Sequence, residues 1–278
     1  MQVTHVKHQE KATIDSGSPL VMALGFFDGV HLGHQALLRE GKRKAEAAGC
    51  RLAVMTFWPH PNEVLKGERN RNYLTPLSKK IETFAAFGVD QVFVVAFDRT
   101  FAALPARDFV AQYVTALNVR HVVVGFDFTF GFKAEGDVRL LRQLSKERRF
   151  GLSVVPKKTY RREKISSSAL RQLLADGDLA LVPYYLGRRY EIDVDSASMK
   201  DDKCWEIVPA DRSLLPMPGR YHVEYFDGRG VAKAVFERFD DARNSCELTF
   251  VDSSGQRNLQ QGKLLFINRI PSVEEKSG

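Results

Sequence analysis

The chain has 278 residues, a formal net charge of +7, 44% hydrophobic and 27% charged residues, which fits a globular protein large enough for two domains. No apolar run approaches the ~20 residues of a membrane span and no signal-peptide pattern opens the chain, so we expect a cytoplasmic protein without membrane contact. The cysteines, Cys50, Cys204 and Cys246, form no CxxC pair, which argues against a zinc site or a disulfide framework.

The charge is distributed unevenly along the chain. Residues 187–278 hold 14 Lys and Arg against 16 Asp and Glu, whereas the first 186 residues hold 27 against 18. This positive excess suits an anionic ligand such as a nucleotide, although a solvated lysine-rich surface would give the same balance. The sequence shows no nucleic-acid-binding motif, so we do not expect nucleic acid as a partner.

Apolar runs alternate with helical stretches through the first two thirds of the chain. Strands are predicted at 21–27, 51–58, 91–97, 121–128 and 152–156, and helices at 34–48, 76–87, 106–117, 138–148, 167–177 and 178–187. Strands that are apolar on both faces and separated by helices are typical of a parallel sheet covered on both sides. We therefore predict a doubly wound α/β domain over residues 1–186, whose ligands bind beyond the carboxyl ends of its strands.

The pattern changes after residue 186. Strands are predicted at 205–209, 220–226, 230–239, 245–251 and 263–270, separated by the turn signals PMPG, DGRG, DSSG and QQGK. These features indicate a small antiparallel barrel or sandwich over residues 187–278.

The segment GFFDGVHLGHQALL lies between the first predicted strand and the first helix. A helix N-terminus offers unpaired N–H groups and a partial positive charge to a phosphate, and Gly25, Gly29 and Gly33 let the backbone approach it. His31 and His34 are three residues apart, so both imidazoles can face one side and stabilise charge on phosphoryl oxygens. The segment is neither a Walker A loop, nor GxGxxG, nor an HExxH zinc motif. Ordinary helix-start histidines would explain an isolated HxGH, but its position after the first strand favours a functional role.

Five segments in the same order resemble motifs of the bacterial FAD synthetases, the adenylyltransferase module of bifunctional riboflavin kinase/FMN adenylyltransferases, within the HxGH nucleotidyltransferases. They are GFFDGVHLGHQALL (25–38), TFWPHP (56–61), LTPLSKKIETFAAFGVD (74–90), VVVGFDFTFG (122–131) and KISSSALRQLLADGDLALVPYYLGRRY (164–190). The resemblance implies that ATP adenylylates FMN to give FAD and pyrophosphate. It implies Mg²⁺ bound with ATP, no dedicated protein metal site, and direct attack of the FMN phosphate on the α-phosphorus.

The resemblance also assigns roles to individual residues. The catalytic positions are His31, His34, Ser167 and Arg171, and the other ATP-binding positions are Gly25, Phe26, Gly33, Ser166 and Ser168. The flavin-binding positions are Phe57, Pro59, Pro61, Asp127, Phe128 and Phe130. Ser168 stands where the family often has Thr, which keeps a hydroxyl. Core packing would explain any single one of these aromatic residues about as well, and His60 is expected only to brace its loop.

The tail departs from the family pattern. In bifunctional members a glycine-rich GRxLGFPTAN stretch, whose Thr and Asn hold metal and ATP, soon follows the LLGRxY exit. Here EIDVDSASMKDDKCWEIVPADRSLLPMPGRYHVEYF follows, without PTAN or a glycine-rich loop, although MPGRYHVEYF resembles the next family strand. We therefore expect a degenerate kinase-type barrel that does not phosphorylate riboflavin and is structural or docks a partner.

Two alternatives remain open at the level of the sequence. The adenylyl acceptor could be another phosphorylated metabolite, against which TFWPHP and GFDFTFG favour a flavin. The protein could instead be a weakly catalytic flavin- or nucleotide-binding regulator whose barrel contacts a partner or RNA. The intact HxGH and SSS…R segments favour catalysis.

Overall fold

The computed structural model describes residues 1–8, 18–68, 71–210, 212–228, 230–239, 245–251 and 261–271. The chain forms two compact units. The first unit comprises Met1–Arg71 and Leu77–Thr159, and the second comprises residues 72–76 and 160–278. Residues 160–186 therefore cluster with the second unit, and the functional boundary after Leu186 stays a prediction.

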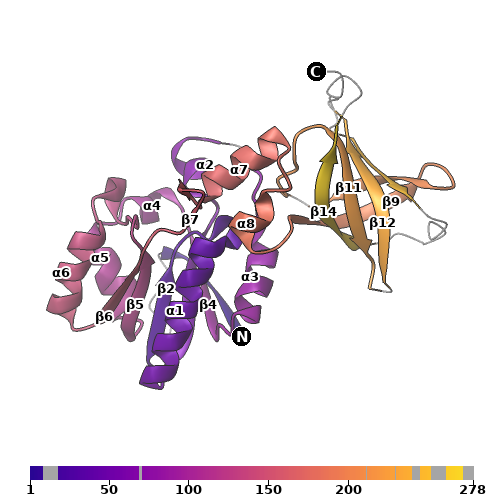
Figure 1. Ribbon diagram of the computed structural model, residues 1–278. Coiled ribbons are helices and arrows are strands. Elements are labelled where there is room, and N and C mark those ends of the chain that lie inside the picture. The colour runs from indigo at the N-terminus through magenta and orange to yellow at the C-terminus, as the bar shows by residue number, and fades with distance from the viewer. Residues whose placement is uncertain are drawn as a thin grey trace. The chain divides into compact units, whose positions relative to one another are not determined.

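A six-stranded sheet forms the centre of the first unit, and all its neighbouring strands are parallel (Figure 1). The strand order is β1-β4-β3-β2-β5-β6. The bounds are β1 Gln2–Val6, β2 Leu20–Leu24, β3 Arg51–Trp58, β4 Gln91–Ala96, β5 Val119–Gly125 and β6 Gly151–Val155. The five predicted strands are confirmed, and β1 is an additional edge strand that the sequence analysis missed.

The side chains of the central strands alternate between two apolar clusters, one on each face of the sheet. On β2, Leu20, Met22 and Leu24 belong to one cluster, whereas Val21 and Ala23 belong to the other. The same alternation continues along β3, β4 and β5. All five β2 side chains are fully buried, as expected for a parallel strand that is covered on both faces.

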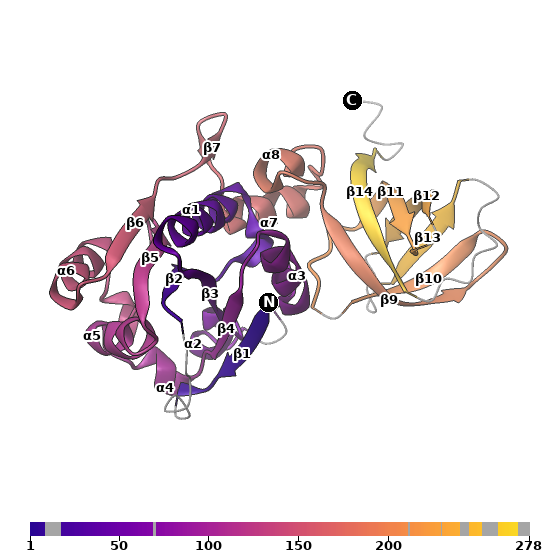
Figure 2. The ribbon, with the colours of Figure 1, turned by 90° about the horizontal axis from the view of Figure 1, so that it is seen from below.

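Helices cover both faces of this sheet, as the doubly wound class requires (Figure 2). One face carries α1 Leu32–Ala48 and α3 Leu77–Ala86, and the other carries α5 Ala106–Val110, its π-helical continuation Ala111–Thr115, and α6 Val138–Arg148. Shorter pieces are the 3-10 turn η2 Asp28–Val30, α2 Pro61–Leu65, α4 Arg99–Ala102 and η4 Phe132–Ala134. Among the described residues, no helix has both the length and the apolar character that a membrane crossing requires.

A short two-stranded ribbon and two helices precede the barrel in the chain. Their bounds are β7 Thr159–Tyr160, β8 Glu163–Lys164, α7 Ser167–Asp176 and α8 Val182–Leu186. The helix predicted at 178–187 forms only in its second half. Pro183 lies in the first turn of α8, the part of a helix that tolerates a proline.

A closed six-stranded antiparallel barrel follows, in the order β10-β13-β12-β11-β14-β9. The bounds are β9 Glu191–Met199, β10 Cys204–Pro209, β11 Gly219–Phe226, β12 Val231–Arg238, β13 Cys246–Phe250 and β14 Gly262–Ile270. The sequence analysis missed β9, which closes the barrel by pairing with both β10 and β14. The barrel interior contains apolar side chains that are all buried, among them Tyr221, Val223, Phe236, Leu248 and Phe266.

Candidate functional site

Three motifs of the first unit follow three adjacent strands at their carboxyl ends. The GFFDG turn follows β2, TFWPHP ends β3, and GFDFTFG spans the end of β5, while the sheet order places β2 between β3 and β5. The chain proceeds from β2 to β3 and β4 on one side of β2, then returns to its other side as β5. Such a topological switch point is where open α/β sheets bind ligands.

The turn between β2 and α1 has an unusual backbone. Phe27, Gly29 and Val30 have φ values of 59°, 85° and 42°. A positive φ is rare for a β-branched residue, and Val30 is fully buried. At Gly33 an added Cβ would come within 3.0 Å of the His31 ring, so the glycine makes room for that imidazole. Strained backbone of this kind persists where its surroundings over-determine it, which is common at functional sites.

The two histidines lie together at the start of α1. His31 is the N-cap, and its Nδ1 accepts a hydrogen bond of 3.3 Å from the backbone N–H of His34. The two rings stack with centroids 3.7 Å apart and planes 14° apart. Because Nδ1 of His31 is an acceptor, the neutral ring carries its proton on Nε2. Because the two rings stack, the prediction that both imidazoles face the same side of the turn is confirmed.

His34 is held in its neutral form. Burial is the main cause that lowers its pKa well below the usual value, and the neighbouring charges of His31 and Lys80 lower that pKa further. The ring packs against Phe27 with centroids 5.1 Å apart. Its Nδ1 atom is buried and has no hydrogen-bond partner among the described residues. Buried polar atoms without partners are uncommon and call for an explanation, of which a functional role is one.

The carbonyl oxygen of Phe26 receives two hydrogen bonds from neighbouring elements. Thr56 Oγ1 on β3 donates at 3.0 Å, and Lys80 Nζ on α3 donates at 3.1 Å. The ammonium of Lys80 also lies 4.2 Å from the centroid of the Phe26 ring. Lys80 is fully buried, and this burial lowers its pKa to about 8, against the opposing effect of Asp28.

The sequence analysis did not single out Lys80. A signal was present, because Lys80 lies on the same stripe of α3 as Leu77 and Phe84, which pack toward the core. A lysine on an apolar helical stripe is a buried charge, and buried charges are rare unless they have a partner.

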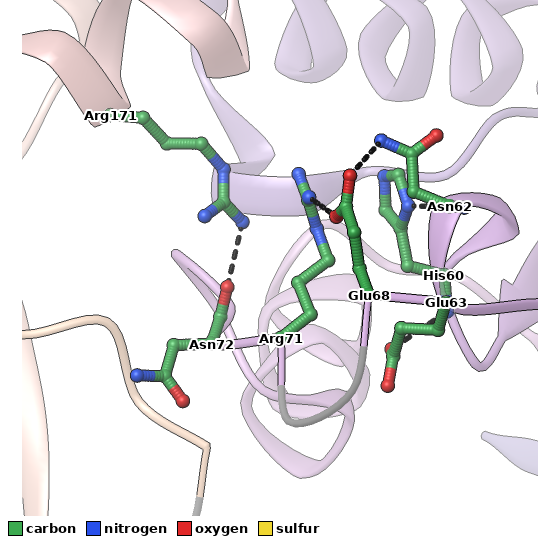
Figure 3. A network of polar contacts seen from close by, with 7 residues as sticks. All are labelled: His60, Asn62, Glu63, Glu68, Arg71, Asn72 and Arg171. Carbon is green, nitrogen blue, oxygen red and sulfur yellow. Dashed lines mark hydrogen bonds and ion pairs between the residues drawn. The ribbon is translucent and has the colours of Figure 1, made fainter. Parts of the chain in front are cut away.

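His60 braces the loop after β3, as expected (Figure 3). Its Nδ1 accepts from the backbone N–H of Asn62 at 3.0 Å, and Glu63 Oε1 accepts from the backbone N–H of His60 at 3.2 Å. This reciprocal capping box opens α2, and Pro61 occupies its first turn. The neighbouring Pro59 follows a cis peptide bond. The edge of the His60 ring also contacts Phe26, with centroids 4.4 Å apart.

The predicted flavin positions after β5 differ in their exposure. Asp127 is exposed, Phe128 is half-buried, and Phe130 is only 7% exposed. Phe128 stacks on Phe130 with centroids 5.6 Å apart, and Phe130 in turn packs against Phe109. Phe57 packs against the same apolar cluster from β3. The aromatic positions from two motifs therefore share one cluster, in which Phe130 belongs to the core and Phe57 and Phe128 lie at its margin.

The remaining predicted residues belong to the second unit. Ser166 is the N-cap of α7, where its side chain accepts from the backbone N–H of Ala169 at 3.2 Å. Ser167 and Ser168 open the helix, and one turn later Arg171 Nη2 donates to the carbonyl of Asn72 at 2.9 Å (Figure 3). This set and the histidine pair belong to different compact units.

Comparison with known proteins places these motifs in a family context. A family model described as FAD synthetase matches residues 13–169. The chain is 40% identical over 193 residues to a bifunctional riboflavin kinase/FMN adenylyltransferase of Bacillus subtilis, covering 69% of this chain and 61% of that protein. It is 32% identical over 230 residues to an FAD synthetase of Listeria monocytogenes, covering 81% of this chain and 87% of that protein.

One solved structure is similar over nearly the whole length of the chain. A crystal structure described as a macrolide-efflux protein from Streptococcus pneumoniae superposes with a TM-score of 0.86 at 25% identity, covering 97% of this chain and 100% of that one. By contrast, the chain spans 61% and 54% of two bifunctional relatives, from B. subtilis and L. monocytogenes.

Proposed function

The chain belongs to the FAD synthetase family, and on this premise we propose that it transfers the adenylyl group of ATP to FMN, giving FAD and pyrophosphate. The observation that carries the proposal is the meeting of three family motifs at the carboxyl ends of β3, β2 and β5. One motif has the chemistry of a phosphate site, and the two beside it have the apolar chemistry of a flavin site.

The reaction needs no nucleophilic side chain. An oxygen of the FMN phosphate attacks the α-phosphorus of ATP, a new P–O bond forms, and the bond to the bridging oxygen of the β-phosphate breaks. Pyrophosphate leaves with the electron pair of that bond. The protein then contributes positioning and stabilisation of charge, as in other phosphoryl transfers.

We assign the phosphate-contacting roles to His31, His34, Ser167 and Arg171. A neutral His34 in the free protein can take up a proton as the triphosphate brings its negative charge, and the resulting imidazolium stabilises charge on the leaving group. His31 presents an N–H at Nε2 on the same face. The guanidinium of Arg171 has the fork geometry that pairs well with phosphate oxygens.

The remaining positions hold the nucleotide and the flavin. Backbone approach at Gly25, Phe26 and Gly33, with the hydroxyls of Ser166 and Ser168, serves ATP. Mg²⁺ would accompany ATP and would be held mainly by phosphate oxygens and water. The isoalloxazine ring lies against the aromatic margin formed by Phe57 and Phe128.

We further propose that the protein does not phosphorylate riboflavin. Residues 192–213, where a kinase would carry its glycine-rich loop, contain no glycine. Part of this segment forms β9, whose pairing with β10 and β14 closes the barrel. A kinase needs close approach of the backbone and fixed ligands around the γ-phosphate and Mg²⁺. A segment without glycine does not supply that close approach.

The test is an assay on the purified full chain with ATP and Mg²⁺, supplied in parallel reactions with FMN and with riboflavin, followed by chromatographic separation of the flavins. We expect FAD from FMN, and neither FMN nor FAD from riboflavin. Absence of FAD in the first reaction would refute the adenylyltransferase assignment, and FMN in the second would refute the loss of kinase activity.

A further inference from the structure

Lys80 is a buried charge with a specific location. Its side chain has no exposed surface, and its Nζ donates to the Phe26 carbonyl at 3.1 Å while lying over the Phe26 ring. Burying an ammonium costs considerable free energy unless other interactions compensate for it. A methionine at this position would fill similar space on the apolar stripe of α3 without that cost. The charge therefore requires an explanation beyond packing.

The carbonyl that Lys80 holds is at the start of the strained turn. Phe26 is the residue before Phe27, the first of the three turn residues with positive φ values; the other two are Gly29 and Val30. Thr56 from β3 donates to the same oxygen at 3.0 Å, so two elements fix one peptide group. Fixing this peptide fixes the direction in which the chain enters the turn and then α1, which begins with the histidine pair.

The same ammonium also acts on His34 through its charge. Lys80 is among the causes that lower the pKa of His34, after burial and His31. The other titratable groups around the turn are Asp28, which favours the charged form of Lys80, and His60, whose ring contacts Phe26. The positive charge of Lys80 opposes protonation of His34 until an anion compensates it.

We propose that Lys80 is a positioning residue for adenylyl transfer, which holds the Phe26 peptide group and so fixes the turn that carries His31 and His34. This inference rests on the proposed function for its catalytic consequence. Its structural part, the coupling of the histidine turn to Lys80 through the Phe26 carbonyl, stands independently of which reaction the site performs.

The first experiment measures that coupling directly in the full chain without substrates. Histidine resonances are titrated by NMR in the wild type, Lys80→Met, Lys80→Arg and the control Lys42→Met, which removes an exposed lysine of α1. We expect Lys80→Met to raise the pKa of His34, whereas Lys80→Arg and Lys42→Met leave it near the wild-type value. An unchanged pKa of His34 in Lys80→Met would overturn the proposal.

The second experiment follows the pH dependence of FAD formation. The ratio kcat/KM for ATP reports ionisations of the free enzyme, so in the wild type we expect a decline above about pH 8, where Lys80 loses its proton. Lys80→Arg should move this decline to higher pH, because a guanidinium stays charged there. Lys80→Met should lower kcat by up to about 10²-fold, the cost of misplaced catalytic groups, and Lys80→Arg should restore part of it. Equal pH profiles in the wild type and Lys80→Arg would contradict the proposal.

A folding defect in Lys80→Met would leave a test in the wild type. The Nζ and Cε resonances of Lys80 should titrate near pH 8, and the amide resonance of Phe27 should change with the same midpoint. An amide that does not respond would show that Lys80 does not hold the turn. If the wild type makes no FAD, the proposed function fails, but these two NMR measurements still decide whether Lys80 positions the turn.

Discussion

At the scale of single residues, the proposed site includes an imidazole, that of His34, whose protonation is controlled mainly by burial. The pKa of His34 lies well below its ordinary value in the free protein, and a bound polyphosphate raises it because the anion favours the imidazolium. Between these two pKa values, ATP binding is accompanied by proton uptake, so ATP affinity should increase as the pH falls through the pKa of His34 in the complex. Calorimetry in buffers of different ionisation enthalpy measures the uptake. A His34→Ala variant should lose it, and an equal uptake in that variant would show that another group takes the proton.

The catalytic contribution of each imidazole follows from its position. Replacing His31 or His34 with Ala removes one preorganised donor aimed at developing phosphoryl charge, which should lower kcat roughly 10²–10³-fold. The affinity for FMN should change far less, because the proposed flavin positions lie at the carboxyl ends of β3 and β5. Steady-state rates with FMN varied at saturating ATP test both statements. Turnover near the wild-type rate in both variants would exclude the assigned role.

Only some of the residues at the candidate site could be recognised from the sequence alone. The histidine pair was recognisable because its residue types and its place after a strand both point to phosphate chemistry. Lys80 was not, since its importance depends on the distant Phe26 carbonyl that meets it only in the folded chain. The exposure of Phe130 was equally hidden, because its motif does not show that Phe109 packs against it.

At the scale of elements, two residues of the aromatic cluster should contribute differently, Phe128 to FMN binding and Phe130 to the stability of the fold. Phe128 is half-buried at the margin, so Phe128→Ala should weaken FMN binding and leave ATP binding nearly unchanged. Phe130 is a core residue, so Phe130→Ala should lower the free energy of unfolding by roughly 3–5 kcal/mol. Quenching of FMN fluorescence and denaturant titrations distinguish the two variants. Weaker ATP binding with unchanged FMN binding in Phe128→Ala would mean that the pocket is assigned to the wrong ligand.

The element pattern was predictable where apolar runs are long. The four inner strands, β2 to β5, are packed on both faces, which produces continuous apolar runs in the sequence. Edge strand β1 was missed because Val3 and Val6 are its only apolar residues, and barrel strand β9 was missed because its apolar residues alternate with polar ones. In β9, Ile192 and Val194 are buried between the polar Glu191, Asp193 and Asp195, and the acidic residues obscured the period of two.

At the scale of the whole molecule, the two compact units differ in the motifs that they carry. The first carries the histidine turn and the flavin motifs, and the second carries α7 and a barrel. The barrel keeps a full aromatic interior, in which Phe236 and Phe266 meet with centroids 5.2 Å apart. Since β9 occupies part of the segment where a kinase would place its glycine-rich loop, we infer that this barrel is kept for its structure or for contact with a partner.

The central claim, transfer of the adenylyl group to FMN by this chain, is tested most directly by tracing the phosphorus atoms of ATP. The full chain is incubated with FMN and Mg²⁺ and with ATP labelled at either the α- or the γ-phosphate, and the products are separated by chromatography. A parallel reaction contains riboflavin with γ-labelled ATP. We expect the α-label to appear in FAD, the γ-label to appear in pyrophosphate, and no label to enter riboflavin. An α-label that never reaches FAD would contradict adenylyl transfer to FMN, and γ-label in FMN would show that the barrel is a working kinase.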